Sequence, residues 1–274
     1  MRVRSWGRHA ARFIERHRHA HVIAQFERSV HLEAEGDVIC LVAPELGNGP
    51  LNAVVEGAAH WPRVGATAEF ERTTRHRVVL HGHVRVDCTA AQTWRAPRPA
   101  CSAPSARRRQ ALGALKALAE AEAPEDGLMR PALDVPAAAT PVSRIARPRI
   151  EHLGCWLLEP SGQPPTDLIG LGPGLTPSGD DLLCGVLIAL HVIGSAHTRQ
   201  ALATAVLEAA PALTSALSNA FLRAAAQGEG SAALHRLINA IVEGNVGEIA
   251  CLATAAGRSG HTSGWDAMAG AAIA

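Results

Sequence analysis

One stretch, Gly170 to Gly185 (GLGPGLTPSGDDLLCG), constrains the fold more than any other part of the chain. Its glycines, prolines, hydroxyls and two adjacent carboxylates run directly into an apolar segment from Leu182 to Leu190. A helix that is apolar on all sides predicts a central position, surrounded by other helices. The glycines predict a tight turn, and the first turn of the helix leaves backbone N–H groups unpaired. The sequence therefore predicts a binding site at the entry to a buried helix.

Composition narrows the classes of partner. The chain has 274 residues, of which 47% are hydrophobic, so it can form one large core or two smaller ones. Its 26 basic and 25 acidic residues leave a net charge of +1, which argues against nucleic acid or an anionic membrane as the main partner. Only 3% of the residues are aromatic, and no apolar run reaches the ~18 residues needed to cross a bilayer. We expect a cytoplasmic protein with a small-molecule ligand.

The first third of the chain has the pattern of β-strands. Residues 5–18 predict a short helix, and short apolar or alternating segments follow it, at 21–26, 30–35, 37–43, 51–56, 77–80 and 83–87. Turn-forming residues separate these segments, as at Gly36 and in the loop 44–50. Several short strands at close spacing predict a small antiparallel barrel or sandwich. The six cysteines are scattered without a CxxC pair, which argues against a zinc ribbon or a disulfide framework.

The rest of the chain has the pattern of helices. A Pro-rich connector at 95–105 is the best domain boundary, and a helix is expected at 105–123. Five prolines predict irregular structure over 124–150, followed by a short strand at 153–158. Helices are then predicted at 177–193, 198–209, 212–227, 231–243, 245–257 and 263–273, with breaks at glycines and at Pro211. The expected fold is α+β: an N-terminal small antiparallel β barrel or sandwich (1–95), a connector with one helix (96–163), and a C-terminal helical bundle (164–274).

The glycine-rich segment has two interpretations. Thr176 is a good N-cap, and Pro177 suits the first helical position. The negative charges of Asp180 and Asp181 would be stabilised by the positive, N-terminal end of the helix dipole. On that interpretation the segment is only a well-capped helix. However, one cap does not need a second hydroxyl at Ser178, and an inward carboxylate needs a partner. The segment matches neither a Walker A loop, a dinucleotide-binding fingerprint nor a nucleophile elbow.

A partial repeat of the segment lies near the C-terminus. Ser263 to Gly270 (SGWDAMAG) repeats Ser178 to Gly185 (SGDDLLCG) as S-G-x-D-x-x-x-G. If both copies begin helices, two helix N-termini converge and bring Asp181 and Asp266 together. Such a site suits a small ligand that carries both anionic groups and amide donors, with His261 as a candidate proton carrier.

Weaker signals lie elsewhere. His81 and His83 would share one face of a strand, but the more favoured interpretation of this pair is structural rather than metal-binding. The segment Asn48 to Asn52 is a turn first, and it could also reach a cleft between the domains. Thr214 and Ser215 are expected to cap a helix. We expect no metal and no cofactor, with a divalent cation at Asp180 and Asp181 as the alternative.

The two glycine-containing motifs resemble the signature of a family of bacterial proteins. Gly170–Gly185 and Gly260–Gly270 (GHTSGWDAMAG) look like the signature of the AllH family, and Asn48–Asn52 is similar to a third, weaker feature. Leu183 and Thr262 depart from it, since Phe and Ser are expected there. The resemblance implies a subunit that works with two others, in anaerobic allantoin breakdown, to interconvert oxalurate and phosphate with oxamate and carbamoyl phosphate.

Roles follow from that resemblance and from the chemistry of the residues. Carbamoyl transfer requires that two reactants be held together and that growing negative charge be stabilised. Asp180, Asp181 and Asp266 would then orient amines or a cation, and His261 would assist proton transfer. The expected anion- and substrate-binding residues are Gly172, Gly174, Thr176, Ser178, Gly179, Ser263, Gly264 and Asn52. Two alternatives stay open: a scaffold subunit without catalytic groups, and an independent enzyme acting on another small amide or carboxylate.

Overall fold

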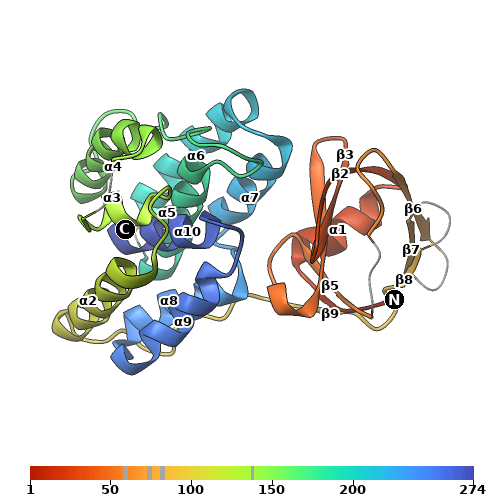
Figure 1. The fold of residues 1–274 in the computed structure, drawn as a ribbon, viewed down its shortest axis with the longest axis horizontal. Coiled ribbons are helices and arrows are strands. Elements are labelled where there is room, and N and C mark those ends of the chain that lie inside the picture. Colours follow the sequence, from red (N-terminus) through yellow and green to blue (C-terminus); the bar gives the residue numbers. More distant parts are fainter. Residues whose placement is uncertain (58–60, 73–75, 81–83, 137–138, 195) are drawn as a thin grey trace. The chain divides into compact units, whose positions relative to one another are not determined.

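The computed structural model describes residues 1–57, 61–72, 76–80, 84–136, 139–194 and 196–274 (Figure 1). It divides into two compact units, Met1–Ala96 and Pro97–Ala274. The first unit is built on a curled β-sheet and the second from helices. The coarse expectation, a β-rich N-terminal part followed by a helical part, is confirmed. None of the described helices is both long and apolar enough to span a membrane.

The sheet of the first unit is mixed rather than antiparallel, which corrects the expectation. Its strands follow the order β5-β4-β3-β2-β6-β7-β8-β1-β9, and β1 also pairs with β5, so the sheet curls back on itself. The pairs β4–β5, β1–β8 and β1–β9 are parallel, whereas β2–β3, β3–β4 and β6–β7 are antiparallel. The strands are β1 (Arg2–Trp6), β2 (His19–Phe26), β3 (Ser29–Ala34), β4 (Asp37–Val42), β5 (Asn52–Glu56), β6 (Thr67–Arg72), β7 (His76–Leu80), β8 (Val84–Asp87) and β9 (Gln92–Thr93).

A short helix, α1 (Arg8–Arg16), packs against this sheet. The expected helix at 5–18 is therefore wrong at its start, where β1 alternates buried Val3 and Ser5 with more exposed neighbours. Phe13 of α1 lies edge-on to Phe70 of β6, with ring centroids 5.6 Å apart. The carbonyl of Pro50 accepts hydrogen bonds from the first amides of α1, at 3.1 Å. The Asn48–Asn52 segment thereby anchors the helix that covers the sheet.

The second unit has one core that all its long helices share. The helix α5 (Ser178–Ile193) runs through its centre and packs along α10 (Ser263–Ile273), as Figure 1 shows. Nearly every residue from Ser178 to Leu190 is buried, which confirms the expected central helix. Around this pair lie α2 (Ser105–Glu122), α3 (Met129–Ala132), α4 (Pro141–Leu158), α6 (Ala196–Leu213), α7 (Ala216–Ala226), α8 (Ala232–Glu243) and α9 (Ile249–Gly257).

The proline-rich segment is more regular than expected. The strand expected at 153–158 is wrong, because these residues end the helix α4. Thr140 caps this helix by accepting from the Ser143 amide at 3.0 Å, and Pro141 follows at a first-turn position where a missing N–H costs nothing. Pro148 lies inside α4, and Pro211 lies inside α6 rather than breaking it. Each removes one helical hydrogen bond, which packing against the shared core offsets.

Candidate functional site

The two repeated motifs meet where α5 crosses α10. A Cβ atom on Gly185 would lie 1.9 Å from the Ala267 carbonyl oxygen, and one on Gly270 would lie 1.8 Å from that of Leu182. Only glycine allows two backbones to approach this closely. The two contacts are equivalent. Gly185 and Leu182 of α5 stand 85 positions before Gly270 and Ala267 of α10, so each contact joins a motif glycine to the residue three positions before the other glycine. The helices α5 and α10 are therefore related by a local two-fold relationship, and both begin on the same side of the crossing.

The same relationship holds for the polar residues at the two helix starts. The Ser178 hydroxyl lies against the carboxyl of Asp266, and the Ser263 hydroxyl lies against that of Asp181. Thr176 joins the cluster, since its Oγ1 lies 3.1 Å from Ser263 Oγ. The structure thus brings together the motif residues that the sequence predicted would converge.

Two of the carboxyl groups in this cluster are electrostatically unusual. Burial raises the pKa of Asp266 to about 6, against the lowering effect of the Leu128 amide and nearby hydroxyls. Burial also raises the pKa of Asp181 well above its usual value, and the negative charges of Asp266 and Asp180 act in the same direction. The Oδ2 atoms of Asp181 and Asp266 are buried and have no hydrogen-bond partner among the described residues. A buried oxygen of this kind is a ready acceptor for a ligand N–H.

Asp180 is arranged differently, although it stands beside Asp181. It is fully buried, and its Oδ1 accepts from the Gly170 amide at 2.8 Å. Its Oδ2 accepts from the Ser218 hydroxyl at 2.6 Å and from the Thr214 hydroxyl. Both oxygens are therefore used by protein donors. This carboxylate ties the glycine-rich loop to the α6–α7 junction, and it gives no support to a cation between Asp180 and Asp181.

The loop that precedes α5 depends on its glycines. Gly170, Gly172 and Gly174 have φ angles of 74°, 117° and 93°, a region that other residues seldom adopt. A Cβ on Gly172 would lie 2.9 Å from the Ser178 amide nitrogen, so this glycine lets the loop close over the start of α5. Thr176 does not cap the helix, contrary to expectation: α5 begins at Ser178 after Pro177, and the Thr176 side chain reaches Ser263 instead.

Two further glycines of the motifs have packing reasons. A Cβ on Gly179 would meet the Leu168 carbonyl oxygen at 2.0 Å, and one on Gly264 would meet that of Ala256 at 2.1 Å. Both residues are buried against backbone. Their role in anion binding stays a prediction.

At the rim of the cluster, the predicted His261 meets residues that the sequence did not indicate. His261 Nε2 lies 3.1 Å from Asp126 Oδ2, and both side chains are exposed. Asp266 Oδ1 accepts from the Leu128 amide at 2.5 Å, and a Cβ on Gly127 would lie 2.9 Å from that oxygen. Asp126 and Gly127 form an Asp-Gly pair inside the proline-rich segment. That pair is typical of a turn, but nothing in its spacing links it to α10.

The other predicted residues come from several parts of the chain. Asn52 belongs to the first unit, where its side-chain amide donates to the Gly47 carbonyl at 3.0 Å, and its role in substrate binding stays a prediction. His81 and His83 lie outside the described residues. Ser215 caps α7, as expected, by accepting from the Ser218 amide. Across the described ranges, no three His, Cys, Asp or Glu side chains gather in a way that could hold a metal ion.

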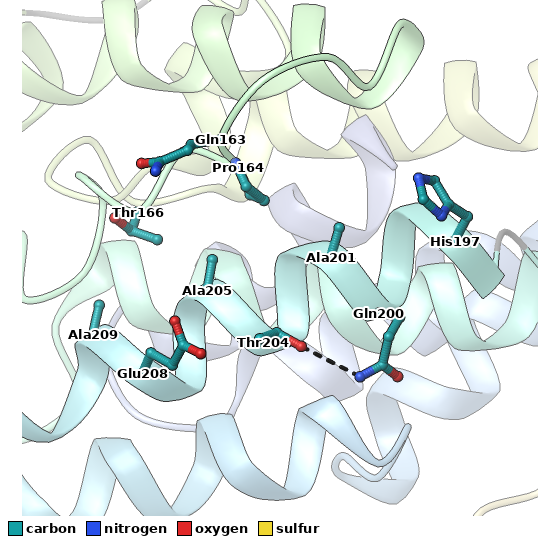
Figure 2. A pocket seen from close by; sticks show the side chains of 10 residues that line it. All are labelled: Gln163, Pro164, Thr166, His197, Gln200, Ala201, Thr204, Ala205, Glu208 and Ala209. Carbon is teal, nitrogen blue, oxygen red and sulfur yellow. Dashed lines mark hydrogen bonds between the residues drawn. The ribbon is translucent and has the colours of Figure 1, made fainter.

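A cavity of about 700 Å³ lies elsewhere in the second unit. Figure 2 shows Gln163, Pro164 and Thr166 on one side of it and one face of α6 on the other. That face alternates small and polar residues, including Ala201, Ala205 and Glu208. No residue of the Asp181–Asp266 cluster lines this cavity.

Comparison with known proteins agrees with the motifs. Residues 168–274 match a family model described as oxamate carbamoyltransferase subunit AllH. The family resemblance is thereby confirmed over α5 to α10 and the loop before α5, and the weaker feature at Asn48–Asn52 lies outside the matched residues. No curated protein and no solved structure matches the chain.

Proposed function

We propose that this chain, whose residues 168–274 match the AllH family, is a subunit of an oxamate carbamoyltransferase. The reaction would interconvert oxalurate and phosphate with oxamate and carbamoyl phosphate. The observation that carries the proposal is the convergence of two helix N-termini on Asp181 and Asp266, each with an unpartnered buried oxygen.

The cluster has the groups that such substrates need. In the direction of oxalurate breakdown, a phosphate oxygen attacks the carbamoyl carbon, and the C–N bond to oxamate breaks as its nitrogen gains a proton. Amide N–H groups of the substrate would bind the free carboxyl oxygens of Asp181 and Asp266. Loop amides at Gly172 and Gly174 would contact oxygens of the substrate. The hydroxyls of Thr176, Ser178 and Ser263 would hold the two carboxyl groups in position.

Proton transfer requires a group that titrates near the working pH. With a pKa of about 6, Asp266 is protonated in part near neutrality, so it can donate a proton to the departing nitrogen. His261 is the second candidate, held at the rim by Asp126. Asp126 links the two candidates. It contacts His261, and its negative charge raises the pKa of Asp266.

The test replaces each carboxyl group by its neutral isostere in the assembled enzyme. Asp181→Asn and Asp266→Asn are each expected to lower kcat/KM for oxalurate phosphorolysis by about 100-fold or more, with folding intact. Asp134→Asn is the matched control, because Asp134 is exposed and pairs with Arg147 away from the cluster. Wild-type turnover in both variants would remove these residues from the mechanism.

A scaffold subunit is the second candidate, and Asp180 favours it. Its carboxylate serves only protein groups, and Gly179, Gly185, Gly264 and Gly270 are all explained by packing. On that reading the motifs stabilise the helical unit without touching substrate. Calorimetric titration of the assembled enzyme with oxamate separates the substrate-binding subunit from the scaffold subunit. If the cluster is the binding site, the Asp181→Asn complex loses the heat of oxamate binding. If the chain is a scaffold, the Asp181→Asn complex binds oxamate as the wild type does.

A further inference from the structure

One arginine side chain closes the proline-rich segment 123–136, which contains α3. Arg130 Nε donates to the Ala123 carbonyl at 2.8 Å, and its Nη1 donates to the Pro136 carbonyl at 3.0 Å. Its Nη2 donates to the Glu120 carbonyl, in the last turn of α2, at 3.2 Å. One planar guanidinium group with five N–H donors can hold three carbonyls in this way, whereas the compact ammonium group of lysine cannot.

The segment 123–136 has few main-chain donors of its own. Pro124, Pro131 and Pro136 lack an N–H group, and α3 is only four residues long, too short to gain much stability from its own hydrogen bonds. The positive charge of Arg130 also faces the carbonyl end of α2, where the helix dipole favours a cation. Replacing Arg130 is therefore expected to loosen the segment.

The same segment contacts the Asp181–Asp266 cluster from one side. The Leu128 amide donates to Asp266 Oδ1 at 2.5 Å, and a Cβ on Gly127 would lie 2.9 Å from that oxygen. With Oδ1 on the Leu128 amide, Oδ2 is the oxygen that has no partner among the described residues. The position of the Leu128 amide therefore sets the direction in which the second oxygen of Asp266 points.

We propose that Arg130 is a positioning residue for Asp266, because its bonds at the two ends of the segment hold the Leu128 amide on Asp266 Oδ1. Arg130 acts through the main chain, since all three of its guanidinium nitrogens donate to carbonyl groups. The inference rests on the proposed function only where Asp266 is assigned to proton transfer. The positioning itself is a property of the free chain.

The effect on Asp266 has an expected direction. The Leu128 side chain is fully buried and should keep the segment in the core when Arg130 is replaced, so that only the bond between amide and carboxyl weakens. That bond is the strongest of the contacts that lower the pKa of Asp266, and its loss should raise this pKa above about 6. The other charged groups that face Asp266 are Asp126 of the segment and Asp181 of α5, and the variant retains both.

Amide hydrogen exchange in the full chain measures the positioning directly. In Arg130→Met, the Leu128 amide is expected to exchange about 10-fold or more faster than in the wild type, while the amides in the middle of α5 keep their wild-type rates. Arg149→Met is the matched control and should leave the exchange of Leu128 unchanged, because Arg149 donates to the Asp167 carbonyl, outside the segment.

Two results of this experiment would overturn the proposal. If Arg130→Met accelerates the amides of α5 as much as that of Leu128, Arg130 contributes only to the overall stability of the unit. Arg130→Lys keeps the charge but cannot bridge both ends of the segment, so it should also accelerate the exchange of Leu128. A wild-type rate in Arg130→Lys would assign the effect to charge alone.

The titration of the Asp266 carboxyl group is the second readout. Carbon NMR of the side-chain carboxyl groups follows it in the full chain, and the absence of the signal in Asp266→Asn assigns it. Arg130→Met is expected to raise the pKa of Asp266 by about 1 pH unit, and Arg149→Met should not change it. An unchanged pKa in Arg130→Met would contradict the positioning. A fall toward 3.8 would also overturn it, by showing that Arg130 only keeps the carboxyl group buried.

Failure of this inference can be told from failure of the proposed function, because neither readout needs turnover. If the assembled wild-type enzyme turns over no oxalurate while Arg130→Met shows both effects, the positioning stands and the assigned reaction is wrong. If the wild type turns over oxalurate while Leu128 in Arg130→Met exchanges at the wild-type rate, the function stands and the positioning is wrong. Where both stand, kcat/KM of Arg130→Met should persist to higher pH than that of the wild type, since a proton donor of higher pKa stays protonated there.

Discussion

At the scale of single residues, neighbouring carboxylates of one motif have different environments. Asp180 is fully buried and satisfied by three protein donors, so it acts as a structural link. Asp181 and Asp266 each retain a buried oxygen without a partner among the described residues. The sequence presents Asp180 and Asp181 as an equal pair. Successive side chains of a helix point in different directions, so Asp180 faces α7 and Asp181 faces α10. This difference separates the structural carboxylate from the candidate binding group.

The raised pKa of Asp266 predicts a pH dependence of stability. Asp266 titrates at 3.8 when unfolded and at about 6 when folded, so its stabilising effect is fully present below pH 3.8 and is lost as pH rises through about 6. The loss amounts to about 3 kcal/mol, at about 1.4 kcal/mol for each pH unit between the two pKa values. Asp181 acts in the same direction, because burial raises its pKa too.

Urea unfolding at pH 4 and pH 8 measures this effect as a difference between two chains. His31 and His235 have folded pKa values of about 4, below their ordinary 6.5, so they contribute the opposite slope in the same window. Comparing the wild type with Asp266→Asn cancels them. The variant is expected to lose less stability than the wild type between pH 4 and pH 8, and to be the more stable of the two at pH 8. If the free energy of unfolding changed equally with pH in the wild type and in Asp266→Asn, the buried state of Asp266 would be contradicted.

At the scale of elements, α5 and α10 pack closely where they cross. The glycines Gly185 and Gly270 bring the two backbones into contact, and this places Asp181 beside Ser263 and Asp266 beside Ser178. The geometry of the cluster therefore depends on the crossing. A side chain at either glycine would move both helix starts apart.

Gly185→Ala and Gly270→Ala are expected to destabilise the helical unit by about 3 kcal/mol or more, because each new methyl group would overlap a backbone carbonyl. The free energy of unfolding in urea is the measurement. Gly113→Ala in α2 and Gly154→Ala in α4 are matched controls, since no atom beyond the adjacent residues and the backbone of the same helix lies within 4 Å of the added Cβ. There, alanine should stabilise the helix by about 0.5–1 kcal/mol. Equal stability of Gly185→Ala and Gly113→Ala would contradict the crossing.

The sequence was most informative where the signal is local. The helix at 263–273 was predicted with its observed limits, and the strands from β2 to β5 lie within a few residues of their expected positions. The cap of α4 is also local, since Thr140 and Pro141 are a favourable pair, but the surrounding prolines outweighed it in the prediction. The strand β1 was missed because it is stabilised by partners about 50 and 85 residues away, and a five-residue strand has little periodicity of its own.

The site shows the same limit. The repeated S-G-x-D-x-x-x-G pattern predicted that Asp181 and Asp266 converge, because identical local environments suit one shared geometry. Ser218, Asp126 and the Leu128 amide carry no such pattern. They reach the cluster through the packing of α7 and of the segment before α3, which depends on contacts between residues more than a hundred positions apart in two of the three cases.

At the scale of the whole molecule, the residues that the structure describes form two hydrophobic cores, which share none of these residues. The core of the first unit lies between α1 and the inner face of the sheet, and that of the second surrounds α5. The family match covers part of the second unit only. All residues of the Asp181–Asp266 cluster, including Asp126 and Leu128, also belong to that unit. The cluster therefore requires no residue of the first unit to form.

The fragment 97–274 is accordingly expected to fold by itself. It retains the complete second core and every hydrogen bond that holds the cluster, including those of Asp180 and Asp266. A unit of this size with its own core normally unfolds cooperatively. Circular dichroism should show a helical spectrum and one sharp thermal transition, within a few degrees of one transition of the full chain. Gly185→Ala should shift the fragment and that transition alike, because both report the α5–α10 crossing. A fragment that melts without cooperativity would show that the second unit depends on the first, and the cluster would then have to be assigned to the whole chain.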